Sequence, residues 1–82
     1  MSPRYRRLLS QAQRVLAEPL PHVPSPCQQV CVMHTGLGWC EGCLRSIDEI
    51  AQWSRASDEA RRAVWAQLPA RVQTREALPP GA

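Results

Sequence analysis

The apolar positions at the start of the chain recur three or four residues apart, as on one face of a helix. They are Tyr5, Leu8, Leu9, Ala12, Val15 and Leu16. Ser2 suits the cap of such a helix, and Pro3 suits its first turn, where a backbone N–H has no helical partner. The pattern predicts a helix over residues 3–17, with its arginines mostly on the other faces.

The stretch "SIDE" at 46–49 predicts the start of a second helix. Ser46 can cap it while Glu49 reaches back to the cap, which is the arrangement of a capping box. The apolar face expected for this short helix consists of Ile47, Ile50, Ala51 and Trp53.

A third helix is predicted from "ASDEARRAVWAQLPAR" at 56–71. Ser57 is its expected cap, and Asp58 and Glu59 suit the positive end of the helix dipole. Pro69 is expected to end it, because proline cannot donate the helical hydrogen bond. The apolar side predicted for it consists of Ala60, Ala63, Val64 and Leu68. Residues 72–82 are expected to form a flexible tail.

Between the first helix and the rest, "EPLPHVPSP" places four prolines in nine residues. Proline fixes its own φ and disfavours helix at the residue before it, so this stretch predicts a stiff, extended linker. The expected organisation is therefore a helical arm with linker at 1–24, a module at 25–71 and the tail.

Charge divides in the same way. The formal net charge is +3, and residues 1–26 carry all of it, as four arginines against Glu18. Residues 27–82 balance six arginines with six acidic residues. A solubilising surface accounts for the basic arm, and attraction to nucleic acid or to an acidic partner is the alternative.

All four cysteines fall within "CQQVCVMHTGLGWCEGC" at 27–43, with three, eight and two residues between successive thiols. Two close pairs joined by a short loop can surround one metal ion. A tetrahedral Zn²⁺ accepts four thiolates at such spacings, and an iron–sulfur cluster uses the same donors. Cys27, Cys31, Cys40 and Cys43 are therefore the predicted ligands of one metal centre, with Zn²⁺ favoured and an iron–sulfur cluster as the alternative.

Other readings of the cysteines are less well supported. Disulfides are rare in a reducing cytoplasm, and the N-terminal stretch lacks the apolar core of a secretory signal. A redox-active "CEGC" pair lacks the strand–turn–helix context of a thioredoxin-like site. An Arg-rich mitochondrial presequence is a minor alternative for the first seventeen residues, and a cytoplasmic protein is the expectation.

Three neighbours of the cysteines have expected roles. Gly42 is expected to take a positive φ and direct backbone amides at sulfur. Arg45 either offsets part of the thiolate charge or is an ordinary solvated arginine. His34 is interpreted as a solvent-facing loop residue, because four thiols make a fifth ligand unnecessary.

From Ser25 to Arg71 the chain resembles a bacterial family of small proteins catalogued as domain of unknown function 1289 and labelled predicted Fe–S proteins. The shared stretches are "SPC" at 25–27, "VC" at 30–31, "CEGC" at 40–43, Arg45, "DEIAQW" at 48–53 and "LPAR" at 68–71. His34 stands where the family has Asp. The resemblance implies a Cys-ligated centre and a bacterial protein.

The sequence thus predicts a small, mainly α protein, with an irregular Cys₄ loop closed onto two short helices and an N-terminal helical arm. The Trp residues and Ile50 are expected to pack around the site. No nucleophile–base set or paired carboxylates indicate an enzyme. A metal-binding interaction module with an unknown protein partner is predicted, and an iron–sulfur protein for electron transfer or sensing is the alternative. No stretch approaches the roughly 20 apolar residues of a membrane span.

Overall fold

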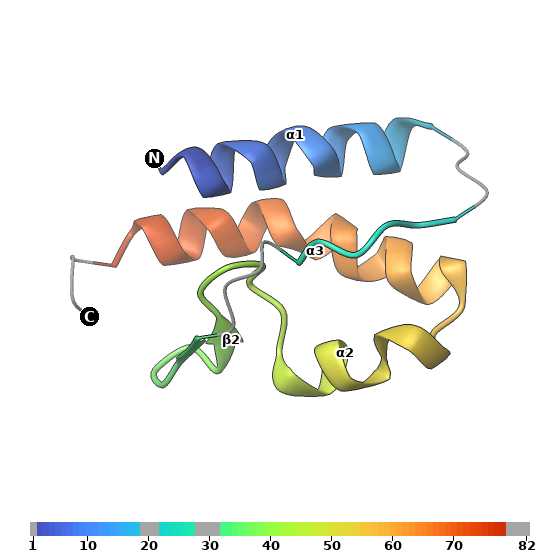
Figure 1. Ribbon diagram of the computed structural model, residues 1–82. Helices are drawn as coiled ribbons and strands as arrows, with labels where there is room; N and C mark the ends of the chain where they lie inside the picture. Colours follow the sequence, from blue (N-terminus) through green and yellow to red (C-terminus); the bar gives the residue numbers. More distant parts are fainter. Residues whose placement is uncertain (1, 19–21, 28–31, 79–82) are drawn as a thin grey trace.

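The computed structural model describes residues 2–18, 22–27 and 32–78. The elements are α1 (Pro3–Ala17), β1 (Met33–His34), β2 (Trp39–Cys40), α2 (Ile47–Gln52), the 3₁₀ turn η1 (Trp53–Arg55) and α3 (Asp58–Glu76). The small, mainly α fold class is confirmed. In Figure 1, α1 and α3 lie side by side and run in opposite directions, and α2 and the strands lie on the other side of α3.

The core lies between α1 and α3. α1 begins as predicted, with the Ser2 hydroxyl accepting the N–H of Tyr5 and with proline in the first turn. The buried side chains are Tyr5, Leu8, Ala12 and Val15 of α1, Trp65, Leu68 and Val72 of α3, and Val23 and Leu44 from the segments between. Leu16 was predicted on the same face of α1 but is 47% exposed. It lies next to the end of the helix, after the last buried residue, Val15.

α1 is therefore packed against the rest of the protein, although the sequence suggested a separate arm. Arg62 of α3 strengthens this contact, since its guanidinium donates to the carbonyl oxygens of Val15 at 2.6 Å and Glu18 at 3.2 Å. These carbonyls lie at the end of α1, where helical partners run out. The independence of the 25–71 module stays a prediction, but the packing favours mutual dependence.

The third helix does not end at Pro69. α3 continues through this proline to Glu76, so the prediction of its end was wrong. An interior proline costs a helix about 3 kcal/mol. The contacts beyond it offset that cost, because Val72 is fully buried and Arg75 binds Glu41. The first part of the expected tail therefore belongs to α3, and residues 79–82 lie outside the described residues.

The predicted apolar side of α3 was only partly right, because Leu68 is fully buried while the other predicted residues are not. Ala60 and Ala63 are exposed, and Val64 is half-buried. The buried stripe is formed by Trp65, Leu68 and Val72, because the largest apolar side chains, rather than the alanines, decide which face turns to the core.

Residues 22–27 run along α3 as an extended segment (Figure 1). The Trp65 indole donates to the Pro24 carbonyl at 2.8 Å, and the Val23 N–H donates to Asp58 at 3.4 Å. This part of the predicted linker is thus attached to the core. Pro19 and Pro21 lie outside the described residues.

The capping box of α2 is present as predicted. The Ser46 hydroxyl accepts the N–H of Glu49, and the Glu49 carboxylate accepts the N–H of Ser46. The predicted apolar face was only partly right, because Ile50 is half-buried while Ile47 is 63% exposed.

Candidate metal centre

A short hairpin brings the last two cysteines into position. β1 and β2 pair antiparallel, with Met33 opposite Cys40 and His34 opposite Trp39. The Cys40 N–H donates to the Arg45 carbonyl at 2.8 Å, and the Glu41 N–H donates to the Val32 carbonyl at 2.7 Å. The "CEGC" turn is therefore held by backbone hydrogen bonds on both sides.

The two thiols of this turn are buried. Cys40 and Cys43 are each 2% exposed. The Gly42 N–H donates to the Cys40 sulfur at 3.3 Å, so the prediction that an amide is directed at sulfur is confirmed. The prediction of a positive φ at Gly42 was wrong. In the described part of this turn the left-handed residue is Leu44, with φ 60°, and its burial in the core holds that conformation.

The environments of the two thiols differ. Burial raises the pKa of Cys40, but hydrogen bonds from the Cys43 and Gly42 amides outweigh it and leave that pKa below its ordinary value. Burial dominates at Cys43 and keeps the pKa of that thiol raised, although Arg45 opposes it. A metal ion that binds both sulfurs must displace the proton of each thiol that is still protonated.

Arg45 is the cation of this site. It is 3% exposed, and its Nε donates to the Cys43 sulfur at 3.2 Å. Its guanidinium also lies 4.9 Å from the centre of the Trp53 ring, in cation–π geometry. The interpretation of Arg45 as an ordinary solvated arginine is therefore wrong, because its guanidinium is buried beside the Cys43 thiol.

The other two predicted ligands are placed differently. Cys27 is exposed, and its N–H donates to the Ser25 hydroxyl at 3.2 Å. Cys31 lies outside the described residues. Within the described ranges no three His, Cys, Asp or Glu side chains form a group that would hold a metal ion. The structure thus brings Cys40 and Cys43 together, and the complete four-cysteine site stays a prediction.

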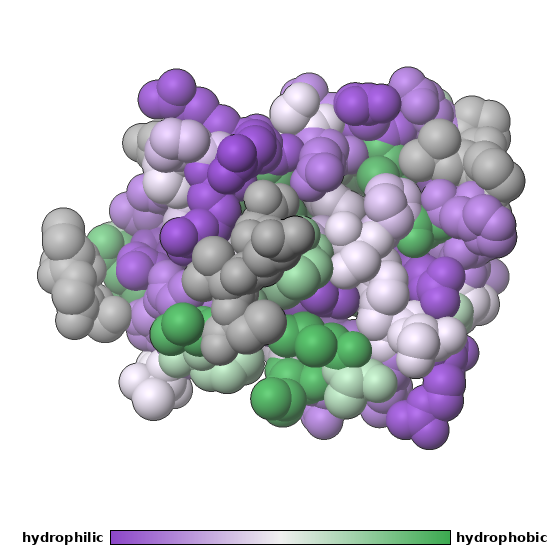
Figure 2. All heavy atoms as spheres, in the orientation of Figure 1, coloured by the Kyte–Doolittle hydropathy of each residue, from purple (hydrophilic) through white to green (hydrophobic). Residues whose placement is uncertain are grey.

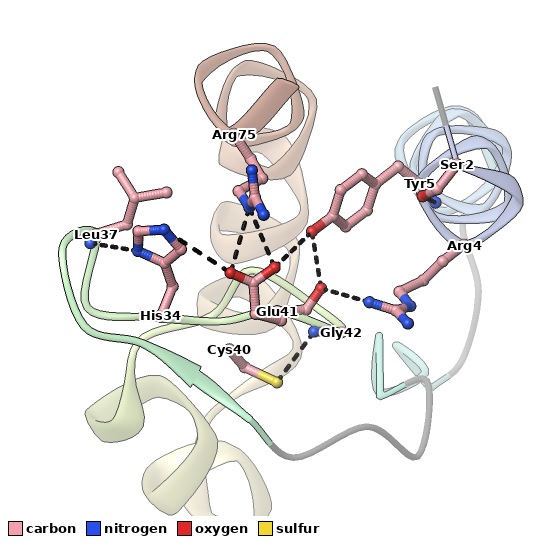
Figure 3. A network of polar contacts seen from close by, with 9 residues as sticks. All are labelled: Ser2, Arg4, Tyr5, His34, Leu37, Cys40, Glu41, Gly42 and Arg75. Atoms are coloured by element: carbon pink, nitrogen blue, oxygen red, sulfur yellow. Dashed lines mark hydrogen bonds and ion pairs between the residues drawn. The ribbon is translucent and has the colours of Figure 1, made fainter. Parts of the chain in front are cut away.

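Glu41, between the two buried cysteines, connects the turn to both long helices (Figure 3). Its carboxylate accepts hydrogen bonds from Arg75 Nε at 3.2 and 3.1 Å. Its backbone carbonyl accepts the Tyr5 hydroxyl at 2.9 Å and an Arg4 N–H at 3.3 Å. No short-range pattern in the sequence points to this role, because the hydrogen-bond partners of Glu41 on α1 and α3 lie more than 30 residues away.

Arg71 fixes the other end of the turn. Its guanidinium donates to the Leu44 carbonyl at 2.9 Å and to both oxygens of Glu49, at 2.6 and 3.0 Å. It also lies over the Trp39 ring, 5.2 Å from its centre. Arg71 thus holds β2, the residue after the cysteine turn and α2 in one arrangement.

His34 is not the solvent-facing residue that the sequence suggested. Its side chain is 9% exposed, and its Nδ1 accepts the Leu37 N–H at 2.9 Å. The ring packs against Gly36, where an added Cβ would lie 3.1 Å from its Cε1. Gly38 completes this turn with φ 72°. His34 therefore closes the hairpin loop, a role that an Asp acceptor also fills in turns.

An apolar patch lies beside the cysteine turn. Two large apolar side chains here are exposed, Val32 at 59% and Ile47 at 63%. Val32 precedes Met33, which pairs with Cys40 of β2, and Ile47 follows Ser46, which bridges to Trp39 of β2. Figure 2 shows apolar residues gathered over the hairpin and the start of α2, at the lower edge of the molecule. Of the tryptophans, Trp39 and Trp53 flank the turn, while Trp65 lies in the helical core.

The chain matches the model of a known protein family. The family described as "Protein of unknown function (DUF1289)" matches residues 25–72. The chain belongs to this family. A search of curated proteins and a search of solved structures each found no match. The matched range includes all four cysteines, Glu41 and Arg71, whereas Tyr5 and Arg75 lie outside it. Two of the anchors of Glu41 are therefore supplied by chain beyond the DUF1289 region.

Proposed function

We propose that this DUF1289 protein is a small metal-binding module in which Cys27, Cys31, Cys40 and Cys43 ligate one metal ion. Zn²⁺ in a structural role is the favoured occupant. The observation that carries the proposal is the buried Cys40–Cys43 turn, with the Gly42 amide and the Arg45 guanidinium directed at the sulfurs. Thiolate ligands carry negative charge, and such donors stabilise it.

The proposal assigns the metal a folding role. Cys43 precedes Leu44, which belongs to the hydrophobic core, so a metal that fixes the turn also fixes a core residue. Four protein thiolates leave Zn²⁺ without an open position for water or substrate. No catalytic step is therefore proposed, and in a reducing cytoplasm the thiols stay available as ligands.

A protein partner is the second part of the proposal. The apolar patch of Val32 and Ile47 is exposed beside the site. Apolar side chains at the centre of an interface supply much of its binding energy. Among the described residues no helix is long and apolar enough to cross a bilayer.

An iron–sulfur cluster is the second candidate. The same hydrogen bonds to sulfur and the same buried guanidinium are among the features by which a protein sets a cluster's reduction potential. This occupant would make the protein an electron carrier or a sensor of oxidants or iron.

Elemental analysis of protein purified without oxygen distinguishes these candidates. We expect one Zn per chain and a colourless protein, whereas iron with sulfide and visible absorbance would identify a cluster. Cys→Ser changes at the four cysteines should each lower the metal content. His34→Ala should keep it, because that ring closes the loop. Protein that binds neither metal when both are supplied would contradict the proposal.

A further inference from the structure

The ten arginines of the chain divide into two groups. Six donate hydrogen bonds within the molecule, namely Arg4, Arg45, Arg61, Arg62, Arg71 and Arg75. The remaining four are Arg6, Arg7, Arg14 and Arg55, all exposed. Within the described ranges their side chains have no hydrogen-bond or ion-pair partner. Three of these four lie on α1, so most of the arginine charge without an internal partner in the described ranges is concentrated on a single helix.

These three arginines share one side of α1. Arg6 and Arg14 are eight residues apart with Ser10 midway, and Arg7 precedes Arg14 by seven, so all four lie along one face. We call Arg6, Arg7, Ser10 and Arg14 the basic stripe. At about 1.5 Å per residue its two ends lie about 10–12 Å apart.

The basic stripe faces away from the core. The core side of α1 carries Tyr5, Leu8, Ala12 and Val15, and every residue of the stripe is exposed. α1 contains no acidic residue, and among the described residues Arg14 forms no ion pair with Glu18, the acid nearest to it in the sequence. Figure 2 shows strongly hydrophilic residues along the edge of the molecule formed by α1, opposite the apolar patch.

We propose that the basic stripe binds the phosphate backbone of a nucleic acid, without reading its sequence. Its side chains are arginines and a serine, with Gln13 beside them, and these are residue types that donate hydrogen bonds to phosphate. Three guanidiniums that form no internal ion pair can bind phosphates without first breaking protein contacts. The proposal does not depend on the metal in the cysteine loop.

An acidic protein and an anionic membrane fit the basic stripe less well than a nucleic acid. A protein interface usually centres on aromatic or apolar side chains, and the exposed apolar residue of α1, Leu16, lies about 160° around the helix from Arg14. A helix that binds membranes buries its own apolar face in the lipid, but that face of α1 is already buried against α3.

The expected affinity is that of weak, salt-dependent binding. Three phosphate contacts on duplex DNA give a slope of about −2.7 for the logarithm of affinity against the logarithm of salt concentration. Raising the salt from 50 mM to 200 mM should therefore weaken binding about 40-fold.

Fluorescence anisotropy with a short labelled DNA duplex, and with a labelled RNA of equal length, tests the proposal on the full chain. The variant R6Q/R7Q/R14Q should reduce binding at least tenfold and flatten the salt dependence. Arg55→Gln is the matched control. It removes an exposed arginine that lies in η1, away from the basic stripe, and should not reduce binding. Circular dichroism confirms that each variant is folded.

Binding of either nucleic acid with these properties supports the proposal, and their relative affinities identify which is preferred. The proposal is overturned if the triple variant binds as well as Arg55→Gln, or if affinity does not change with salt. It is also overturned if polyglutamate competes as effectively as unlabelled nucleic acid at equal charge, since the stripe would then serve an acidic protein.

Discussion

The Tyr5 hydroxyl lies 2.9 Å from the backbone oxygen of Glu41, to which it donates a hydrogen bond, and 3.4 Å from one oxygen of the Glu41 carboxylate. This contact joins the first turn of α1 to the residue between the two buried cysteines (Figure 3). The N-terminal helix therefore bears directly on the candidate metal centre.

Tyr5→Phe should destabilise the protein by about 1 kcal/mol, the usual net value of one hydrogen bond. For a chain of this size that corresponds to a fall of roughly 4–8 °C in Tm. Thermal unfolding of metal-loaded protein followed by circular dichroism measures it. Ser10→Ala, on the exposed side of α1, is the control and should change Tm little.

Tyr5→Phe should also change how the stability of the protein falls at alkaline pH. Burial, followed by the Glu41 charge, raises the pKa of Tyr5. Because the folded-state pKa lies above that of the unfolded chain, at about 10, the contribution of the neutral phenol is complete below pH 10. It is lost as the pH rises through the folded-state pKa. Tyr5→Phe should therefore lose less stability than the natural chain between neutral pH and pH values above 10.

Leu8→Ala tests whether α1 is part of the core. Leu8 is fully buried between α1 and α3, and truncation of such a residue costs about 2–5 kcal/mol. Leu16→Ala is the matched control on the same helix, with a side chain that is 47% exposed. Urea unfolding should show a large loss for the first variant and a small one for the second.

Deletion of residues 1–20 extends this test. The sequence suggested that the 25–71 module would survive it, whereas the packing of Trp65, Leu68 and Val72 against α1 favours a severe loss of stability. A truncated protein that keeps its metal and unfolds near the temperature of the full chain would restore the view of α1 as an independent arm.

The features of the fold that could be predicted from the sequence are those that depend on residues close together in the chain. The caps at Ser2, Ser46 and Ser57 were predictable, because each serine side chain accepts the N–H of the residue three positions further along the chain. The continuation of α3 past Pro69 was not, since it depends on contacts of Val72 and Arg75 with distant segments. Local propensity gives way to packing at such positions.

The same distinction holds at the site. The spacing of the cysteines predicted a turn, and the structure places Cys40 and Cys43 together in it. The Tyr5–Glu41 and Arg71–Glu49 contacts join residues 36 and 22 positions apart. No periodicity or short motif encodes such pairs, so Glu41 appeared in the sequence only as an acidic residue between two thiols.

Removal of the proposed metal should unfold the cysteine loop. A structural Zn²⁺ contributes about 10 kcal/mol or more in small peptides, which exceeds the roughly 3–5 kcal/mol expected of a core this small. Chelation under reducing conditions should lower the urea midpoint and expose Cys40 and Cys43 to a thiol reagent. Retention of both properties after chelation would show that the thiols are buried without a metal.

Arg45→Gln should weaken metal binding. It removes the guanidinium that donates to the Cys43 sulfur and stacks on Trp53, and loss of a partner behind a metal ligand typically costs 10–100-fold in affinity. Competition with a chromophoric chelator measures this. Arg55→Gln, an exposed neighbour in η1, is the control. Arg45→Lys should recover little, because an ammonium cannot reproduce the planar stack.

The Glu49–Arg71 pair should make stability depend on pH in the acid range. Hydrogen bonds from Arg71 lower the pKa of Glu49, and the Ser46 amide acts in the same direction against burial. Since the folded-state pKa lies below that of the unfolded chain, at about 4.3, the contribution is complete above that pH and is lost as pH falls through the folded-state value. Glu49→Gln should therefore lower stability at neutral pH and weaken its decline in acid.

Asp48→Asn is the matched control for this pair, because Asp48 is the other acid in the first turn of α2 and is exposed. Urea unfolding of the three proteins at pH 7 and in the range below pH 4 separates the effects. The Glu49 variant should approach the natural chain in stability as the pH falls, while the Asp48 variant should follow the natural chain throughout. If both variants behaved alike, helix-dipole effects common to the first turn would account for the acid response. The bidentate contact with Arg71 would then contribute nothing particular to it.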